Sequence, residues 1–118
     1  MIVTVQLSVS VINNKVVKSA KATRRLNLPF IPRKGESLLI EYRYTDDNGK
    51  EVEGHITPTV RGVSYVLPWK NTPGHQTKII LDCGVPYPCK ELVMFEKAVE
   101  IWRGAEFDVT IKEEDDDF

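Results

Sequence analysis

Long hydrophobic runs are missing from this chain. None of its apolar stretches approaches the roughly 20 residues that a membrane-spanning helix needs. The first residues carry neither a positive segment nor an unbroken apolar block, so we expect a cytoplasmic protein with no membrane partner. Only two cysteines are present, too few for a disulfide framework. Because 118 residues suffice for one hydrophobic core, the composition predicts a single globular domain.

Catalytic and cofactor motifs are also missing. The chain has no glycine-rich phosphate loop and no nucleophile elbow, and neither of its two histidines stands beside a nucleophile. Cys83 and Cys89 enclose five residues, two of them proline, a spacing unlike the short loop that wraps a zinc ion. We therefore expect no enzyme activity, no cofactor and no metal, and buried thiols at both cysteines. A labile disulfide and a zinc site remain alternatives, the zinc ligands being His55, His75, Cys83 and Cys89.

Acidic residues are absent from the first 35 positions, which hold seven of the 16 basic residues. All 17 acidic residues follow, and five of them fill positions 113–117. Residues 1–112 thus carry 16 basic and 12 acidic side chains. Such asymmetry favours an anionic partner or an acidic interaction tail. The seven early basic residues are Lys15, Lys18, Lys21, Arg24, Arg25, Arg33 and Lys34.

Strand patterns occupy most of the chain. Apolar residues alternate with Thr, Gln and Ser over residues 3–11, and a turn at Asn13 and Asn14 leads into a second strand over 15–28. Lys18 and Arg24 interrupt the apolar side of that second strand, so we expect a bulge there or a strand end that overhangs the core. Later strands are predicted over 38–44, 50–56, 60–67, 76–81 and 107–111, with a hairpin turn at Asn48 and Gly49.

The period changes to that of a helix near the C-terminal end. Apolar residues cover about half of the circumference over residues 89–103, with Pro88 suited to the start and Gly104 to the stop. An arc this wide indicates that the helix lies deep across the sheet or is also covered by a second subunit, which would make a homo-oligomer through the helix face.

These elements predict an α+β, mainly β fold: a small antiparallel β-barrel or roll, SH3-like or OB-like, with one amphipathic helix near the C-terminus. We expect one domain over residues 1–112, with the helix at about 89–103, and an acidic tail over 113–118.

The basic N-terminal hairpin is the candidate binding surface. Alternate side chains on a strand lie about 6 to 7 Å apart, which approximates the phosphate spacing of a nucleic acid strand. Aromatic rings beside a basic groove are typical of proteins that bind single strands without sequence preference. The predicted nucleic-acid-binding residues are Lys15, Lys18, Lys21, Arg24, Arg25, Lys34, Tyr42, Tyr44 and Trp69.

The chain ends in KEEDDDF, residues 112–118. This segment resembles the acidic C-terminal tails, ending in Phe, of bacterial and phage single-stranded-DNA-binding proteins. In that family the tail competes with DNA for the basic groove and docks its last Phe on replication enzymes. The resemblance implies partner binding by Asp115, Asp116, Asp117 and Phe118 and a DNA face on the basic hairpin.

Two function classes follow. The first is a non-enzymatic β protein that binds single-stranded nucleic acid through the hairpin, with the tail as a regulator or partner hook. The second is a protein-interaction or inhibitor module in which the tail or the helix face contacts a protein and nucleic acid has no role. A self-assembling structural protein is a further alternative.

Overall fold

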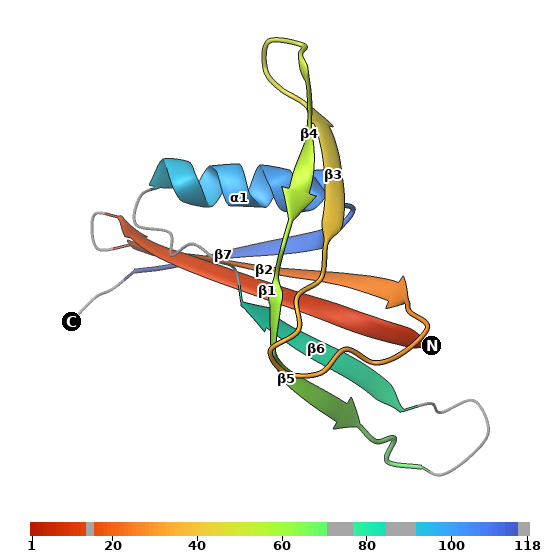
Figure 1. The fold of residues 1–118 in the computed structure, drawn as a ribbon. Coiled ribbons are helices and arrows are strands. Elements are labelled where there is room, and N and C mark those ends of the chain that lie inside the picture. The colour runs from red at the N-terminus through yellow and green to blue at the C-terminus, as the bar shows by residue number, and fades with distance from the viewer. Residues whose placement is uncertain (14–15, 71–76, 85–91, 116–118) are drawn as a thin grey trace.

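The computed structural model describes residues 1–13, 16–70, 77–84 and 92–115. These residues form seven strands and one helix, so the protein is mainly β, as predicted (Figure 1). The elements are β1 (Ile2–Asn13), β2 (Val16–Asn27), β3 (Ile40–Thr45), β4 (Glu51–Ile56), β5 (Thr59–Val66), β6 (Lys78–Gly84), α1 (Leu92–Gly104) and β7 (Asp108–Asp115).

Five strands form the main sheet, in the order β5, β6, β1, β2, β7. At its centre β1 and β2 pair over twelve residues, from Ile2 opposite Asn27 to Asn13 opposite Val16. This pairing confirms the hairpin that the alternating apolar and polar residues predicted. Alternation favours such a strand because one of its sides is buried while the other faces solvent. The predicted bulge in β2 does not occur, since the pairing register with β1 is unbroken.

One pairing differs from the predicted antiparallel arrangement. β6 runs parallel to β1, with Thr4 opposite Ile80 and Gln6 opposite Asp82. The prediction is wrong for this pair because apolar alternation looks the same in both strand directions. The chain reaches β6 only after β3, β4 and β5, and this long path sets the direction in which it enters the sheet.

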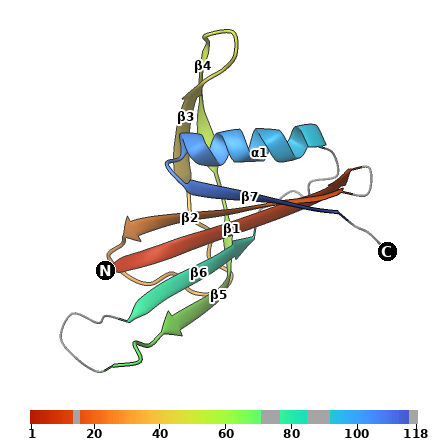
Figure 2. The ribbon, with the colours of Figure 1, turned by 180° about the vertical axis from the view of Figure 1, so that it is seen from behind.

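The core lies between the main sheet and α1. Leu7 and Leu81 on the sheet are fully buried, and α1 contributes Phe95, Val99 and Trp102. Figures 1 and 2 show α1 across one face of the sheet. We call this the covered face and the opposite one the open face. The deep position of α1 accounts for its wide apolar arc. The buried apolar residues are Val3, Val5, Leu7, Val9, Val11, Ala20, Ala22, Ile40, Val60, Leu81, Cys83, Phe95, Val99, Trp102, Ala105 and Phe107.

A two-stranded hairpin of β3 and β4 stands beside α1 (Figure 1). Its turn is the predicted one: Gly49 has a φ of 78°, and the Asp46 carboxylate accepts hydrogen bonds from the backbone N–H groups of Asn48 and Lys50. Within the hairpin the Tyr42 ring covers Gly54, where a Cβ atom would lie 2.5 Å from the Tyr42 hydroxyl oxygen. Glycine at this position therefore lets the ring lie flat on β4.

The helix α1 ends at Gly104, as the sequence predicts, and this glycine does not adopt a positive φ. A Cβ atom on Gly104 would lie 3.0 Å from the Arg43 carbonyl oxygen, so the missing side chain lets β3 approach the helix. The left-handed residue at this end of the helix is Glu106, with a φ of 64°.

The two sheets are not closed into a barrel, so the structure does not confirm the predicted barrel or roll. Within the described residues β3 and β4 pair only with each other, and β5 and β7 form the two edges of the main sheet. The reason lies in the β3–β4 hairpin, which packs against α1 instead of extending the main sheet. Its Tyr44 ring lies against the end of the helix near Gly104.

No helix in the described part of the chain is long and apolar enough to cross a membrane.

Candidate interaction surfaces

The cations of β2 lie on opposite faces of the sheet. The open face carries Lys21 and Arg25, opposite Ser8 and Thr4 of β1, whereas Lys18 and Arg24 share the covered face with the buried core. A strand points successive side chains to opposite sides, so one continuous basic surface cannot form from all four. Lys15 lies outside the described residues.

Lys18 is engaged within the protein. Its ammonium nitrogen lies 3.3 Å from a carboxylate oxygen of Glu113 and 5.8 Å from the centre of the Phe95 ring, and its side chain is 23% exposed. Glu113 is the first residue of the predicted tail. β7 in fact continues through Asp115, which pairs with Val16, so the start of the acidic segment lies alongside the basic strand.

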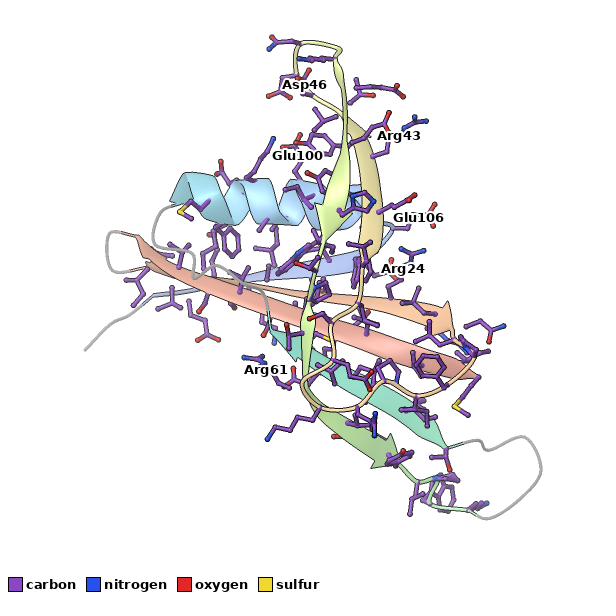
Figure 3. All side chains as sticks on the ribbon, viewed as in Figure 1. Arg24, Arg43, Asp46, Arg61, Glu100 and Glu106 are labelled. Carbon is purple, nitrogen blue, oxygen red and sulfur yellow. The ribbon has the colours of Figure 1, made fainter. Side chains whose placement is uncertain are left out.

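Arg24 holds the end of the helix. Its guanidinium donates a 2.7 Å hydrogen bond to the carbonyl oxygen of Ala105 and lies 4.0 Å from the Glu106 carboxylate (Figure 3). Both partners belong to the connection between α1 and β7, which includes the left-handed Glu106. This contact ties β2 to the connection that follows α1, so Arg24 has a structural role here.

The open face mixes both charges. β7 places Lys112 opposite Ser19, and Asp108 opposite Thr23. Asp108 is therefore a diagonal neighbour of both Lys21 and Arg25 on this face. Three cations remain exposed on β2 and β7, but an acid stands between two of them.

The predicted aromatic residues lie elsewhere. Tyr42 and Tyr44 stack on the β3–β4 hairpin with ring centres 6.0 Å apart. The Lys97 ammonium donates a hydrogen bond to the Tyr44 hydroxyl, which raises the pKa of Lys97. Trp69 is 82% exposed beyond β5, with the Lys70 nitrogen 4.4 Å from its ring centre. The structure thus does not bring these rings together with the open-face cations.

Lys34 is exposed in the segment between β2 and β3. Its neighbour Arg33 donates a 2.7 Å backbone hydrogen bond to the Glu36 carboxylate and lies in ion-pair range of it. The backbone N–H of Arg33 lowers the pKa of Glu36. This loop is separate from the cations of β2 on the open face.

The tail residues Asp116, Asp117 and Phe118 lie outside the described part of the chain.

The structure describes two of the four residues of the alternative zinc site, Cys83 and His55. Cys83 is a fully buried free thiol on β6, and burial raises its pKa to about 11. His55, exposed on β4, lies 3.7 Å from the Glu41 carboxylate. His75 and Cys89 lie outside the described residues. Within those residues no three His, Cys, Asp or Glu side chains are grouped so that they could hold a metal ion.

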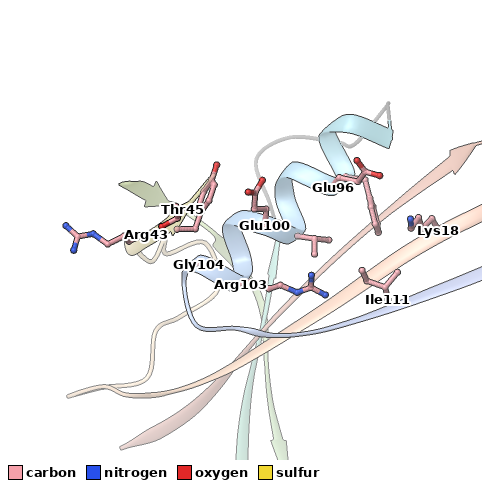
Figure 4. Close-up of a pocket in the computed structure, with 11 residues that line it drawn as sticks. Lys18, Arg43, Thr45, Glu96, Glu100, Arg103, Gly104 and Ile111 are labelled. Carbon is pink, nitrogen blue, oxygen red and sulfur yellow. The ribbon is translucent and has the colours of Figure 1, made fainter. Parts of the chain in front are cut away.

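Two grooves flank the β3–β4 hairpin. One, of about 450 Å³, runs between α1, β3 and the edge strand β7 (Figure 4). Its lining combines apolar Phe95 and Ile111 with the charged side chains of Glu100 and Arg103. The other, of about 1000 Å³, lies between the hairpin and the ends of β2 and α1, and includes Arg24 and His55.

Sequence reasoning singled out only Trp69 from a group of exposed apolar residues at the end of β5. Tyr65, Val66, Leu67 and Trp69 are exposed by 57%, 46%, 72% and 82% at the end of β5. We call these four residues the apolar end of β5. Alternation along this segment predicted a strand with one apolar face, and only the structure shows that apolar side chains stay exposed on both faces at this end.

The two edges of the main sheet differ. The start of β5 is already occupied, because Val60 exchanges hydrogen bonds with Gly35 and Glu36, and a register shift follows between Val60 and Gly62. β7 pairs with β2 over eight residues without a shift, and its outer edge has no partner strand within the described residues.

Comparisons of this chain with protein-family models, with curated proteins and with solved structures give no match.

Proposed function

We propose that this protein is a non-enzymatic binding module whose partner is another protein, contacted through the apolar end of β5. The observation that carries the proposal is the exposure of four large apolar side chains within five residues, between 46% and 82% each. Exposed apolar residues are ordinary when they are scattered singly, whereas grouped ones mark interaction sites. Two of the four are aromatic, and such residues dominate the energy of protein interfaces.

The position of this group supports strand addition as the binding mode. Beyond the part of β5 that contacts Gly35 and Glu36, the edge of β5 is free within the described residues. A peptide that pairs with this edge gains backbone hydrogen bonds, and its alternate side chains contact one face of the sheet. Tyr65 pairs with Ile79 and Val66 with Lys78, so successive residues offer contacts on opposite faces.

The test uses a displayed library of random peptides selected against the full-length protein. Selected peptides are expected to be extended and apolar at alternate positions. We expect the double variant Leu67→Ser and Trp69→Ser to bind them at least about tenfold more weakly, because buried aromatic anchors carry most of an interface's energy.

The matched control is the double variant Ile12→Ser and Leu39→Ser, which removes two side chains exposed by 68% and 69% in other places. It should bind the peptides as the unaltered protein does. Equal binding by both double variants, or no enrichment of any peptide, would overturn the proposal.

A second candidate function is the binding of single-stranded nucleic acid by the open face, with the acidic tail as regulator. It is favoured by Lys21, Arg25 and Lys112, which are all exposed on this face. The pairing of Glu114 with Val17 places the start of the acidic segment on the open face as well, which favours regulation by the tail, since acids there compete for the same cations.

A labelled oligothymidine at low salt tests this candidate. Removal of residues 116–118 should tighten binding, and Arg25→Glu should weaken it and reduce the slope of log affinity against log salt by about 0.7. Lys50→Glu makes the same kind of charge change at the turn of the β3–β4 hairpin and should alter binding much less. Absence of any binding by the shortened chain would end this candidate.

A further inference from the structure

We propose that β7 pairs with β7 of a second copy of this chain, antiparallel and centred on Thr110, so that two main sheets join into one. The proposal is independent of the partner suggested for β5. It begins with the outer edge of β7, which lies at the end of the sheet and has no partner strand in the described part of the chain. Its eight residues pair with β2 without a register shift, so this edge is long and regular.

Symmetry restricts the possible registers. Two copies that join as antiparallel strands are related by a twofold axis normal to the sheet, which keeps both covered faces on the same side. Directly opposite residues in an antiparallel pair point to the same face. Even-numbered residues of β7 must therefore face even-numbered residues of the other copy, and odd-numbered residues must face odd-numbered ones. The pairing is then centred on one residue that faces the same residue of the other copy.

The charges favour the register centred on Thr110 over those centred on Ile111 and Lys112. With Thr110 at the centre, Asp108 faces Lys112 of the other copy, and the symmetric pair repeats this contact. With Ile111 at the centre, Asp108 would face Glu114, and with Lys112 at the centre two ammonium groups would meet. Opposite charges across a strand pair stabilise it and like charges destabilise it.

The neighbouring residues fit the same register. On the covered face Val109 would face Ile111 of the other copy, which covers an Ile111 side chain that is 39% exposed in the single chain. On the open face the two Thr110 hydroxyls would be adjacent, a favourable cross-strand pair. Asp108 and Lys112 are both exposed and form no ion pair with other described residues, so both are free to make the new contact.

The groove beside β7 leaves room for the second strand's side chains. It runs along this edge under α1, and Figure 4 shows Arg103 reaching from the helix toward the strands near Ile111. In the proposed register Glu113 of the second copy faces Phe107, whose backbone N–H donates a hydrogen bond to the Trp102 carbonyl in the last turn of α1. Glu113 keeps its ion pair with Lys18 of its own chain, so the attraction between the copies comes from Asp108 and Lys112.

Charged side chains on an edge strand normally prevent pairing with other strands. Here their spacing excludes strands of unrelated sequence while it favours an identical one, because Asp108 and Lys112 complement each other only in the antiparallel self-pairing. The same charges thus act against general aggregation and for the pairing of two copies.

Solution mass measured over a range of protein concentrations tests the proposal. The unaltered chain should reach twice its mass of 13.4 kDa as concentration rises. Asp108→Lys alone and Lys112→Asp alone should each remain monomeric, because each places two like charges opposite each other. A chain with both changes should dimerise again, since the charges are exchanged.

The most specific experiment mixes the two single variants. One then carries lysine at both positions and the other aspartate at both, so the mixture should form a dimer of one copy of each, although neither variant dimerises alone. This result also shows that both variants are folded. The controls Asp47→Lys and Lys34→Asp make the same changes at exposed positions away from β7 and should dimerise like the unaltered chain.

A monomer at every concentration would overturn the proposal, as would single variants that dimerise normally. Monomeric single variants that fail to combine would overturn the register centred on Thr110.

Discussion

The covered and open faces of the main sheet are built from the same strands but use their residues differently. On β1 the covered face presents Val5 and Leu7, which are fully buried, while the open face presents Ser8 and Ser10, which are exposed. The difference comes from α1, which lies on one side only (Figures 1 and 2). Residues that are adjacent in the chain thus acquire different roles.

Arg24 and Arg25 illustrate the lesson. Arg24 points to the covered side, where it bonds to the Ala105 carbonyl, and Arg25 points to the open side, where it is exposed. A count of basic residues treats the two as equivalent, but only the second is free to meet a partner. Four tests show how far this contrast between the faces extends.

The largest effect is expected from the core of the covered face. Leu7→Ala should lower the free energy of unfolding by about 2 to 5 kcal/mol, because it removes apolar contacts and leaves a cavity. Ser8→Ala, at the next position on the open face, should change it by less than about 0.5 kcal/mol. Urea unfolding curves measure both, and similar losses at the two positions would contradict the assignment of the faces.

A second effect depends on pH, through the buried thiol of Cys83. Its pKa is raised from 9.0 to about 11, chiefly by burial and further by Asp82. Between these values the unfolded chain loses the thiol proton while the folded chain keeps it, so the stabilisation present below pH 9 is lost as pH rises toward 11. The loss is at most about 3 kcal/mol, since one pKa unit corresponds to about 1.4 kcal/mol.

Unfolding measured from pH 8 to 11 checks this against Cys83→Ala, which is less stable throughout but lacks this titration. The two stability curves should therefore approach each other as the pH rises. Parallel curves would show that the thiol is not protected in the folded state.

Arg24→Ala should cost about 1.5 kcal/mol, the low end of the range for a hydrogen bond that involves a charged group. Arg25→Ala on the open face should cost less than about 0.5 kcal/mol. Thermal unfolding compares the two variants. Equal stability would show that the Arg24 contact with Ala105 does not hold the connection between α1 and β7.

The smallest effect is expected from Lys18 and Glu113. Their side chains are 23% and 60% exposed, so the coupling energy in a double-mutant cycle to Ala should be at most about 1 kcal/mol and should fall with added salt. Lys21 and Glu114 lie on the open face opposite different residues and should show additive changes. Coupling in the second pair as strong as in the first would contradict the observed register.

Much of the strand structure could be predicted because it depends on local pattern. The alternation in residues 3–11 and the Asn48–Gly49 turn specify two hairpins through side-chain period and backbone preference, and both are present. The parallel pairing of β1 with β6 could not be predicted, since alternation carries no direction. The sequence grouped four basic residues of β2, of which Lys21 and Arg25 are exposed together while Lys18 and Arg24 are engaged within the protein; their role in binding stays a prediction.

The sequence by itself determined where strands and helix form, because apolar residues recur with a different period in a strand and in a helix. Each segment shows one of these two periods. It also determined the charge asymmetry, with no acid in the first 35 residues. Only the tertiary structure decided which side of the main sheet α1 covers, that β7 brings Glu113 beside Lys18, and that the apolar end of β5 stays exposed. These outcomes depend on contacts between residues far apart in the chain, which no local pattern specifies.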